Sequence, residues 1–165
     1  MVAFPFSSSL AVAVGGNTPS HLGSAFATVS ASIPRLKLLL AAFARLDASR
    51  IVASQLIQTR PVGGPIDQAP YVTAVVLVPE VSRAVTDSAA LELLDLLQSL
   101  ETAFGRDRAR EQRWGPRSLD LDLLFWGELR MDHPDLMLPH PRMHLRSFVL
   151  EPLLQAMQGT HPPCW

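Results

Sequence analysis

Apolar and polar positions along the 165-residue chain divide it into alternating strands and helices. Short apolar or alternating runs predict strands, and apolar residues at helical spacing predict helices. The predicted strands span 10–14, 50–59, 71–78 and 119–126, and the predicted helices span 32–46, 89–104 and 147–157. The first six elements follow the order βαββαβ. This order predicts an α+β fold with a ferredoxin-like βαββαβ core, an antiparallel-dominated sheet and helices packed on one face of it.

Turn and cap residues set the expected boundaries of these elements. Ser32 and Pro34 predict the start of the first helix, which leaves 18–31 as a loop with at most one helical turn. Gly105 is the expected cap of the second helix. Gly and Pro fill 60–70, and the length of this loop indicates a function. Gly127 predicts a turn, 129–131 a short returning strand, and 132–141 a proline-interrupted loop.

The predicted strand at 119–126 carries the most unusual pattern. Leu119, Leu121, Leu123 and Phe125 alternate with polar positions, so one side of the strand faces the core and Asp120 and Asp122 share the other side. Two carboxylates this close repel each other unless a cation lies between them. Mg²⁺ with substrate phosphates is the usual solution. The alternative is two solvated positions on an edge strand.

Arginines cluster just before this strand. Arg106, Arg108, Arg110, Arg113 and Arg117 lie within twelve residues. Arginine binds phosphate oxygens through paired hydrogen bonds, although a charged surface loop has the same composition. Together with the paired aspartates, the arginines predict a polyphosphate site.

Composition narrows the functional classes. Hydrophobic residues make up 48% of the chain, which predicts one folded domain over 1–165. The net charge is −1, so no basic surface indicates nucleic acid. Cys164 is the single cysteine, so no internal disulfide is expected. The apolar run at 4–14 lacks a basic start and is too short to span a bilayer, so we expect no membrane segment and a cytoplasmic location.

The segment RWGPRSLDLDLL, residues 113–124, closely resembles the signature of the 6-hydroxymethyl-7,8-dihydropterin pyrophosphokinases. These folate-pathway enzymes transfer diphosphate from ATP to the hydroxymethyl group of the pterin and release AMP. The resemblance implies ATP as co-substrate, two Mg²⁺ ions held by Asp120 and Asp122, and a monomer that binds small molecules only. It also implies that Arg106, Arg117, Asp120 and Asp122 are catalytic.

The resemblance extends residue by residue to both substrates. On the pterin side it implies Thr59, Pro61, Val62, Tyr71, Thr73, Trp114 and Phe148. On the nucleotide side it implies Gln98, Glu101, Arg108, Arg113, Arg117, Leu123, His140 and Arg146. Gly15 and Asn17 match the end of the family's first strand. Taken alone, Tyr71 and Phe148 fit core positions better than binding positions.

Four features depart from the family pattern. Thr73 stands where the family usually has an asparagine that binds the pterin edge, and Pro141 replaces a polar or aromatic residue. The arginine loop is one residue longer than usual. The segment 18–31 carries about ten extra residues.

Other functions remain open from the residues alone. His140 and His144 have the spacing of a zinc pair on a helix, although the flanking prolines argue against a helix there. A binding module that holds nucleotide without catalysis would have the same fold. An RNA-binding domain would need aromatic residues on central strands and a broad basic surface, and the sequence predicts neither.

Overall fold

The computed structural model describes residues 7–61 and 63–159. Its elements are β1 (Leu10–Gly16), α1 (Ala25–Ala44), β2 (Val52–Ala53), β3 (Ile57–Thr59), β4 (Tyr71–Val78), α2 (Asp87–Ala103), β5 (Asp120–Trp126), β6 (Met131–His133), β7 (Leu136–Leu138) and α3 (Ser147–Gly159). Short 3-10 turns occur at Ala48–Arg50, Arg108–Arg110 and Met143–Leu145.

The main sheet has the strand order β2-β4-β1-β5, and β3 also pairs with β4. All of these pairings are antiparallel. The strands β1 and β4 are central and buried, because their Val, Leu and Ala side chains are apolar on both faces of the sheet. The α+β prediction and the ferredoxin-like order are therefore confirmed.

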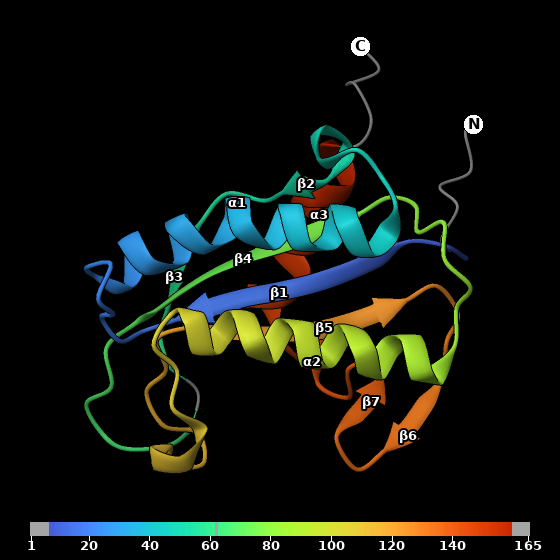
Figure 1. The fold of residues 1–165 in the computed structure, drawn as a ribbon. Helices are drawn as coiled ribbons and strands as arrows, with labels where there is room; N and C mark the ends of the chain where they lie inside the picture. Colours follow the sequence, from blue (N-terminus) through green and yellow to red (C-terminus); the bar gives the residue numbers. More distant parts are fainter. Residues whose placement is uncertain (1–6, 62, 160–165) are drawn as a thin grey trace.

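Helices cover both faces of this sheet, so the prediction that they lie on one face is wrong (Figure 1). Helices α1 and α2 pack on the face formed by Val12, Val76 and Leu121, whereas α3 packs on Ala11, Val75 and Leu77. The helix α1 is long and apolar enough to cross a membrane by length and composition alone. Its buried residues, among them Leu36 and Leu40, pack into the core beside the sheet.

The helix α1 begins seven residues before the predicted N-cap, Ser32. The hydroxyl of Ser24 caps it by accepting from the backbone N–H of Ala27 at 3.2 Å. Ser32 lies inside the helix, where its hydroxyl donates to the Val29 carbonyl at 2.7 Å. Small residues with little hydrophobic contrast hide this first part of the helix, so the loop prediction for 18–31 is wrong for residues 25–31 and is confirmed for residues 18–24. The predicted end of α2 is confirmed, since Gly105 follows it with φ +88°.

The predicted strand at 50–59 is broken into β2 and β3. At the break, the Ser54 hydroxyl accepts from the Val75 N–H at 2.9 Å, and the Ser54 N–H donates to the Val75 carbonyl at 2.9 Å. A side chain thus takes the place of a backbone acceptor. Another departure lies at 131–138, where β6 and β7 form a hairpin instead of the predicted loop.

The strand β5 contains a bulge that changes which side its residues face. Ala11 pairs with Phe125 and Val12 pairs with Leu123, so Leu124 has no partner in β1. Before the bulge, Leu121 and Leu123 face α1 and α2 as predicted. After it, Phe125 packs toward α3, and Trp126 packs in the core between the sheet and the helices α1 and α2. The prediction that Phe125 shares a face with Leu123 is therefore wrong.

Candidate active site

A cavity of about 410 Å³ lies on the face of the sheet that α3 only partly covers. The strands β1, β4 and β5 form its floor, and the loop at 60–70, the arginine loop at 106–117 and the segment 140–149 form its walls. The predicted site residues that line it are Thr59, Tyr71, Thr73, Trp114, Arg117, Asp120, Asp122, His140, Arg146 and Phe148. The structure therefore gathers residues from both predicted substrate groups around one space.

Asp120 and Asp122 both face this cavity, as the alternation before the bulge predicts. Burial, followed by the negative charge of Asp120, raises the pKa of Asp122 to about 7. The nearest ionisable nitrogen to the Asp122 carboxylate is Nε2 of His140, at 4.0 Å from Oδ2. Asp122 thus lacks the close ion pairs that neutralise Asp120.

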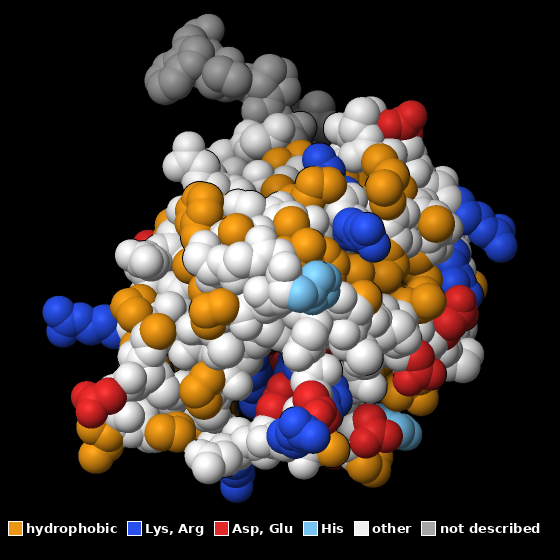
Figure 2. Space-filling view, turned by 60° about the vertical axis from the view of Figure 1, so that its left-hand side comes forward, with side chains coloured by type: hydrophobic (Ala, Val, Ile, Leu, Met, Phe, Trp, Pro, Cys, Tyr) orange, Lys and Arg blue, Asp and Glu red, His pale blue; other side chains and the backbone are white. Residues whose placement is uncertain are grey.

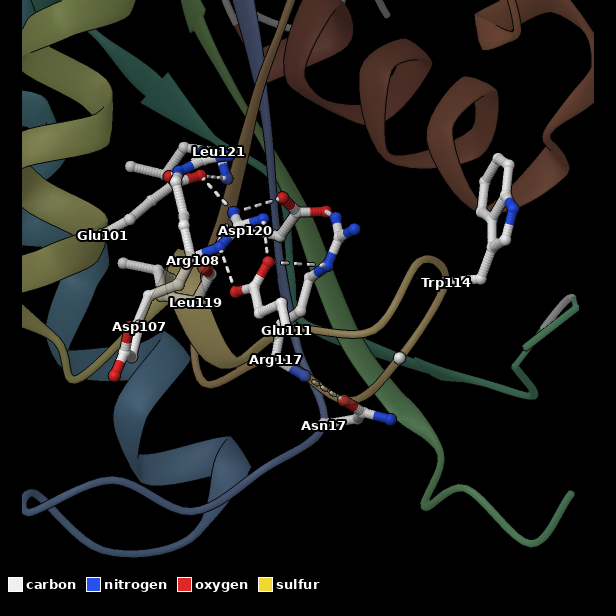
Figure 3. Close-up of polar contacts among 12 residues, drawn as sticks. Asn17, Glu101, Asp107, Arg108, Glu111, Trp114, Arg117, Leu119, Asp120 and Leu121 are labelled. Atoms are coloured by element: carbon white, nitrogen blue, oxygen red, sulfur yellow. Dashed lines mark hydrogen bonds and ion pairs between the residues drawn. The ribbon is translucent and has the colours of Figure 1, made fainter. Parts of the chain in front are cut away.

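Asp120 belongs to a cluster of ion pairs whose centre, Arg106 and Glu101, is buried (Figure 3). Its Oδ1 lies 2.7 Å from Nη1 of Arg106, and its Oδ2 lies 2.9 Å from Nη1 of Arg117. The guanidinium of Arg106 is 3% exposed, and its Nε and Nη2 donate to both Glu111 oxygens at 2.6 and 3.0 Å. Arg106 therefore makes bidentate contact with Glu111 while it holds Asp120.

Glu101 anchors this cluster to the helix α2. Its side chain is 1% exposed, and its Oε1 accepts from Nη1 of Arg106 and from the Leu121 N–H, each at 2.7 Å. Its Oε2 pairs with Arg108. Burial raises the pKa of Glu101, and the Leu121 N–H and Arg106 act against this rise. Glu101 thereby fixes the start of β5, directly beside the two aspartates.

Figure 2 shows acidic and basic side chains gathered around a hollow on the face of the molecule that it displays. This mixture explains why a chain with a net charge of −1 can still carry a dense group of arginines. In the cluster described above, Glu101, Glu111 and Asp120 balance Arg106, Arg108 and Arg117.

His140 is held beside Asp122 by its own backbone. The His140 N–H donates to the Leu124 carbonyl at 2.7 Å, and the Arg142 N–H donates to Nδ1 of His140 at 3.2 Å. Burial and the nearby Arg146 lower the pKa of His140, which keeps the ring neutral at pH 7. Since Nδ1 accepts a hydrogen bond, the ring proton lies on Nε2, on the side of Asp122.

The opposite part of the cavity is less polar. The Tyr71 hydroxyl donates to the Gly115 carbonyl at 3.1 Å, and burial raises its pKa. The Thr73 side chain is 9% exposed, and its Oγ1 has no hydrogen-bond partner although it is buried. Phe148 projects from the first turn of α3. A flat ligand between Tyr71 and Phe148 would have the Thr73 hydroxyl as a polar contact.

Trp114 has an unusual backbone conformation, with φ +62°. Its side chain points away from the ion-pair cluster (Figure 3). The guanidinium of Arg142 lies 4.2 Å from the centre of its ring, and that of Arg113 lies 5.6 Å away. Arg142 therefore adds a cation to the cavity wall.

Several predicted site residues lie outside the cavity. Arg106 and Glu101 are buried behind it, and Arg108 pairs with Glu101. The side chain of Leu123 packs in the core. Gln98, Arg113 and Pro61 do not line the space, and Val62 lies outside the described residues.

The sequence analysis missed several residues that build the site. Arg60 and Arg142 line the cavity, and Glu111 neutralises Arg106. Asn17 was noted only as a match, and Gln68 was not noted. The sequence does contain a signal for Glu111. A carboxylate among several arginines indicates an ion pair within the loop.

The carboxylates fit a hard divalent cation. Within 7–61 and 63–159 no group of three or more His, Cys, Asp or Glu residues could hold a metal, so the zinc alternative for His140 and His144 has no support. Asp120 and Asp122 supply two carboxylates, and the raised pKa of Asp122 indicates an unmet need for positive charge. Mg²⁺ typically takes one or two carboxylates and completes its shell with water and phosphate.

Known proteins resemble this chain over most of its length. Residues 11–158 match the family described as 7,8-dihydro-6-hydroxymethylpterin-pyrophosphokinase (HPPK). A 2-amino-4-hydroxy-6-hydroxymethyldihydropteridine pyrophosphokinase from Pseudomonas aeruginosa is 40% identical over 135 residues, 78% of each chain. The Haemophilus influenzae protein of the same name is 38% identical over 124 residues, 74% of this chain and 72% of the relative. The Bacillus subtilis protein of that name is 40% identical over 105 residues, 64% of this chain and 58% of the relative.

Proposed function

The chain belongs to the 7,8-dihydro-6-hydroxymethylpterin-pyrophosphokinase family, and we propose that it uses this cavity to transfer diphosphate from ATP to 6-hydroxymethyl-7,8-dihydropterin in folate biosynthesis. The observation that carries this assignment to particular residues is the division of the cavity. Paired carboxylates and arginines lie at one end, and aromatic side chains with an unpaired hydroxyl lie at the other. This division suits one polyanionic substrate and one flat heterocyclic substrate.

In the proposed reaction, the hydroxymethyl oxygen of the pterin attacks the β-phosphorus of ATP. An O–P bond forms as the hydroxyl gives up its proton to solvent. The bond between the β-phosphorus and the oxygen that bridges it to the α-phosphorus breaks, and AMP leaves with that oxygen. Alignment and charge neutralisation supply the rate, because phosphoryl transfer needs little covalent help from the protein. Tyr71, Phe148 and Trp114 would hold the pterin, and the Thr73 hydroxyl would bind its edge.

Asp120 and Asp122 would hold two magnesium ions together with the phosphates. Magnesium, when bound, neutralises phosphate charge and polarises the phosphoryl oxygens. Arg117 lies 2.9 Å from Asp120 and lines the cavity, so it can contact the transferring group. His140 carries its proton on the side of Asp122, where it can donate to a phosphate oxygen. Arg106 would not touch the substrates. It would act by holding Asp120 in place, which refines the catalytic role expected for Arg106.

Four expectations carry over as parts of the proposal: ATP as co-substrate, two magnesium ions, a monomeric state and a cytoplasmic location. Analytical ultracentrifugation with and without substrates tests the monomer. Magnesium titration with an ATP analogue tests the stoichiometry.

Incubation with Mg-ATP and the hydroxymethyl pterin tests the function. We expect AMP to form in equal amount to the pterin diphosphate, with no ADP. ADP formation would contradict diphosphate transfer. Binding of ATP without any AMP release would instead support a nucleotide-binding module.

A further inference from the structure

The side-chain amide of Gln68 connects the two loops that form the cavity walls. Its Nε2 donates to the Trp114 carbonyl at 3.0 Å, in the arginine loop. The same nitrogen lies 3.2 Å from the Gly63 carbonyl and 3.4 Å from the Pro65 carbonyl, within the 60–70 loop. One amide group therefore serves carbonyl groups from both walls.

Asn17 extends this connection to the end of β1. Its Nδ2 donates to the Ala69 carbonyl at 3.0 Å and to Oε1 of Gln68 at 3.4 Å. Its Oδ1 accepts from the Arg117 N–H, and its own N–H donates to the Arg117 carbonyl, both at 2.9 Å. Asn17 is 4% exposed. Both loops are thus tied to a rigid central strand.

The two loops approach each other most closely at Gly64. Its φ is +81°, and a Cβ atom there would lie 2.1 Å from the Trp114 carbonyl oxygen and 2.5 Å from Nε2 of Gln68. Any side chain at this position would push the loops apart. The neighbouring Gly63 has a similar φ of +77°, but a Cβ atom there would meet nothing within 4 Å.

The Gln68 contact reaches Trp114 where its backbone is strained. A non-glycine residue at φ +62° persists only where its surroundings hold it. The Trp114 carbonyl is held by Gln68, and the following residue, Gly115, accepts from the Tyr71 hydroxyl. The conformation of the arginine loop thus depends on Gln68 of the other wall and on Tyr71 of the cavity floor.

We propose that Gln68 is a positioning residue that couples occupancy of the pterin side of the cavity to occupancy of the nucleotide side. This inference rests on the proposed function. A ligand that orders one loop also orders the other through Gln68, so the second ligand binds to a wall already in place. Gln68 does not line the cavity, so its effect is on the coupling and not on contact with either substrate.

Calorimetry measures this coupling as the ratio of two pterin dissociation constants, without and with a non-hydrolysable ATP analogue and Mg²⁺. In the wild-type protein we expect a ratio of about tenfold or more, within the usual range of such couplings. In Gln68→Leu the ratio should fall to about 1–2, while the dissociation constant without analogue changes by less than about threefold. Gln158→Leu makes the same chemical change on the exposed end of α3 and should keep the wild-type ratio.

The adjacent glycines provide a second test that leaves Gln68 in place. Gly64→Ala brings both strain and the clash with Trp114, and should abolish the coupling as Gln68→Leu does. Gly63→Ala brings similar backbone strain without the clash, and this variant should retain most of the coupling.

A wild-type ratio near one, or full coupling in both Gln68→Leu and Gly64→Ala, would overturn the inference while leaving diphosphate transfer intact. Failure of the wild-type protein to release AMP would overturn the proposed function and this inference with it.

Discussion

The surroundings of Asp120 and those of Asp122 differ in how completely they neutralise the carboxylate. Asp120 contacts two arginines within a partly buried cluster of ion pairs. Asp122, two residues further along, lies 4.0 Å from Nε2 of a neutral histidine, and its pKa is raised to about 7 although Arg146 and Arg117 act against this rise. The difference indicates that the ion pairs around Asp120 support the structure of the site, whereas the charge of Asp122 is neutralised by what binds in the cavity. Substitutions in the two regions should therefore have different consequences.

Removal of Arg106 should have the largest effect on the fold. Arg106→Met leaves Glu101 buried with one of its cations missing, and loss of one partner of a buried pair costs about 3–5 kcal/mol. Urea denaturation followed by circular dichroism measures this loss. Arg110→Ala removes an 88% exposed guanidinium from the same loop and should change stability by less than about 0.5 kcal/mol. Equal midpoints for the two variants would show that the cluster does not support the fold.

Substitutions of the two aspartates should have similar effects on turnover but different effects on stability. Asp122→Asn should lower turnover by about 10²-fold, the scale of a lost preorganised charge stabiliser. Its stability at neutral pH should stay the same or rise, because the change breaks no arginine pair and removes a carboxylate whose pKa is raised to about 7. Asp120→Asn should lower turnover similarly and also cost about 1–3 kcal/mol, because two charged hydrogen bonds are weakened. Steady-state AMP release and urea midpoints measure both. Near wild-type turnover in Asp122→Asn would remove this residue from the proposed metal site.

Acid should weaken magnesium binding to the free protein. Protons and Mg²⁺ compete for the Asp122 carboxylate, whose pKa is about 7, so affinity should fall by up to about tenfold per pH unit below 7 and level off above it. The folded pKa lies above the ordinary value of 3.8, so stability should decrease as pH rises from about 4 to about 7. Asp122→Asn should flatten both profiles. Calorimetric Mg²⁺ titrations and urea midpoints at several pH values test the two signs.

The smallest effect concerns the unpaired hydroxyl of Thr73. Thr73→Val keeps the shape and removes a buried group without a partner, so stability should stay the same or rise slightly. Pterin binding should weaken by about 0.5–1.5 kcal/mol, the net value of one hydrogen bond. Ser118→Ala removes another buried, unpaired hydroxyl that does not line the cavity, and should leave pterin affinity unchanged. Equal pterin affinities for the wild-type protein and Thr73→Val would place the pterin elsewhere.

The sequence predicted those features that depend on local pattern. The β-branched run at 71–78 forms the central strand β4, and alternation places Asp120 and Asp122 on one face. The start of α1 could not be predicted, because residues 18–31 are small and carry little hydrophobic contrast. The arginines were interpreted as phosphate ligands. Nothing in the local pattern shows that Glu101, in the last turn of α2 and five residues before Arg106, would be buried against its guanidinium.

The bulge at Leu124 has a consequence for the site as well as for the core. The strand β5 lies at the edge of the main sheet, so part of its backbone faces away from β1. Leu124 is skipped by β1, and its carbonyl instead accepts the N–H of His140. That bond fixes the distant segment around 140 against β5, two residues beyond Asp122. The residue at which the pairing with β1 is interrupted thus acts as the docking point that places the His140 imidazole beside the Asp122 carboxylate.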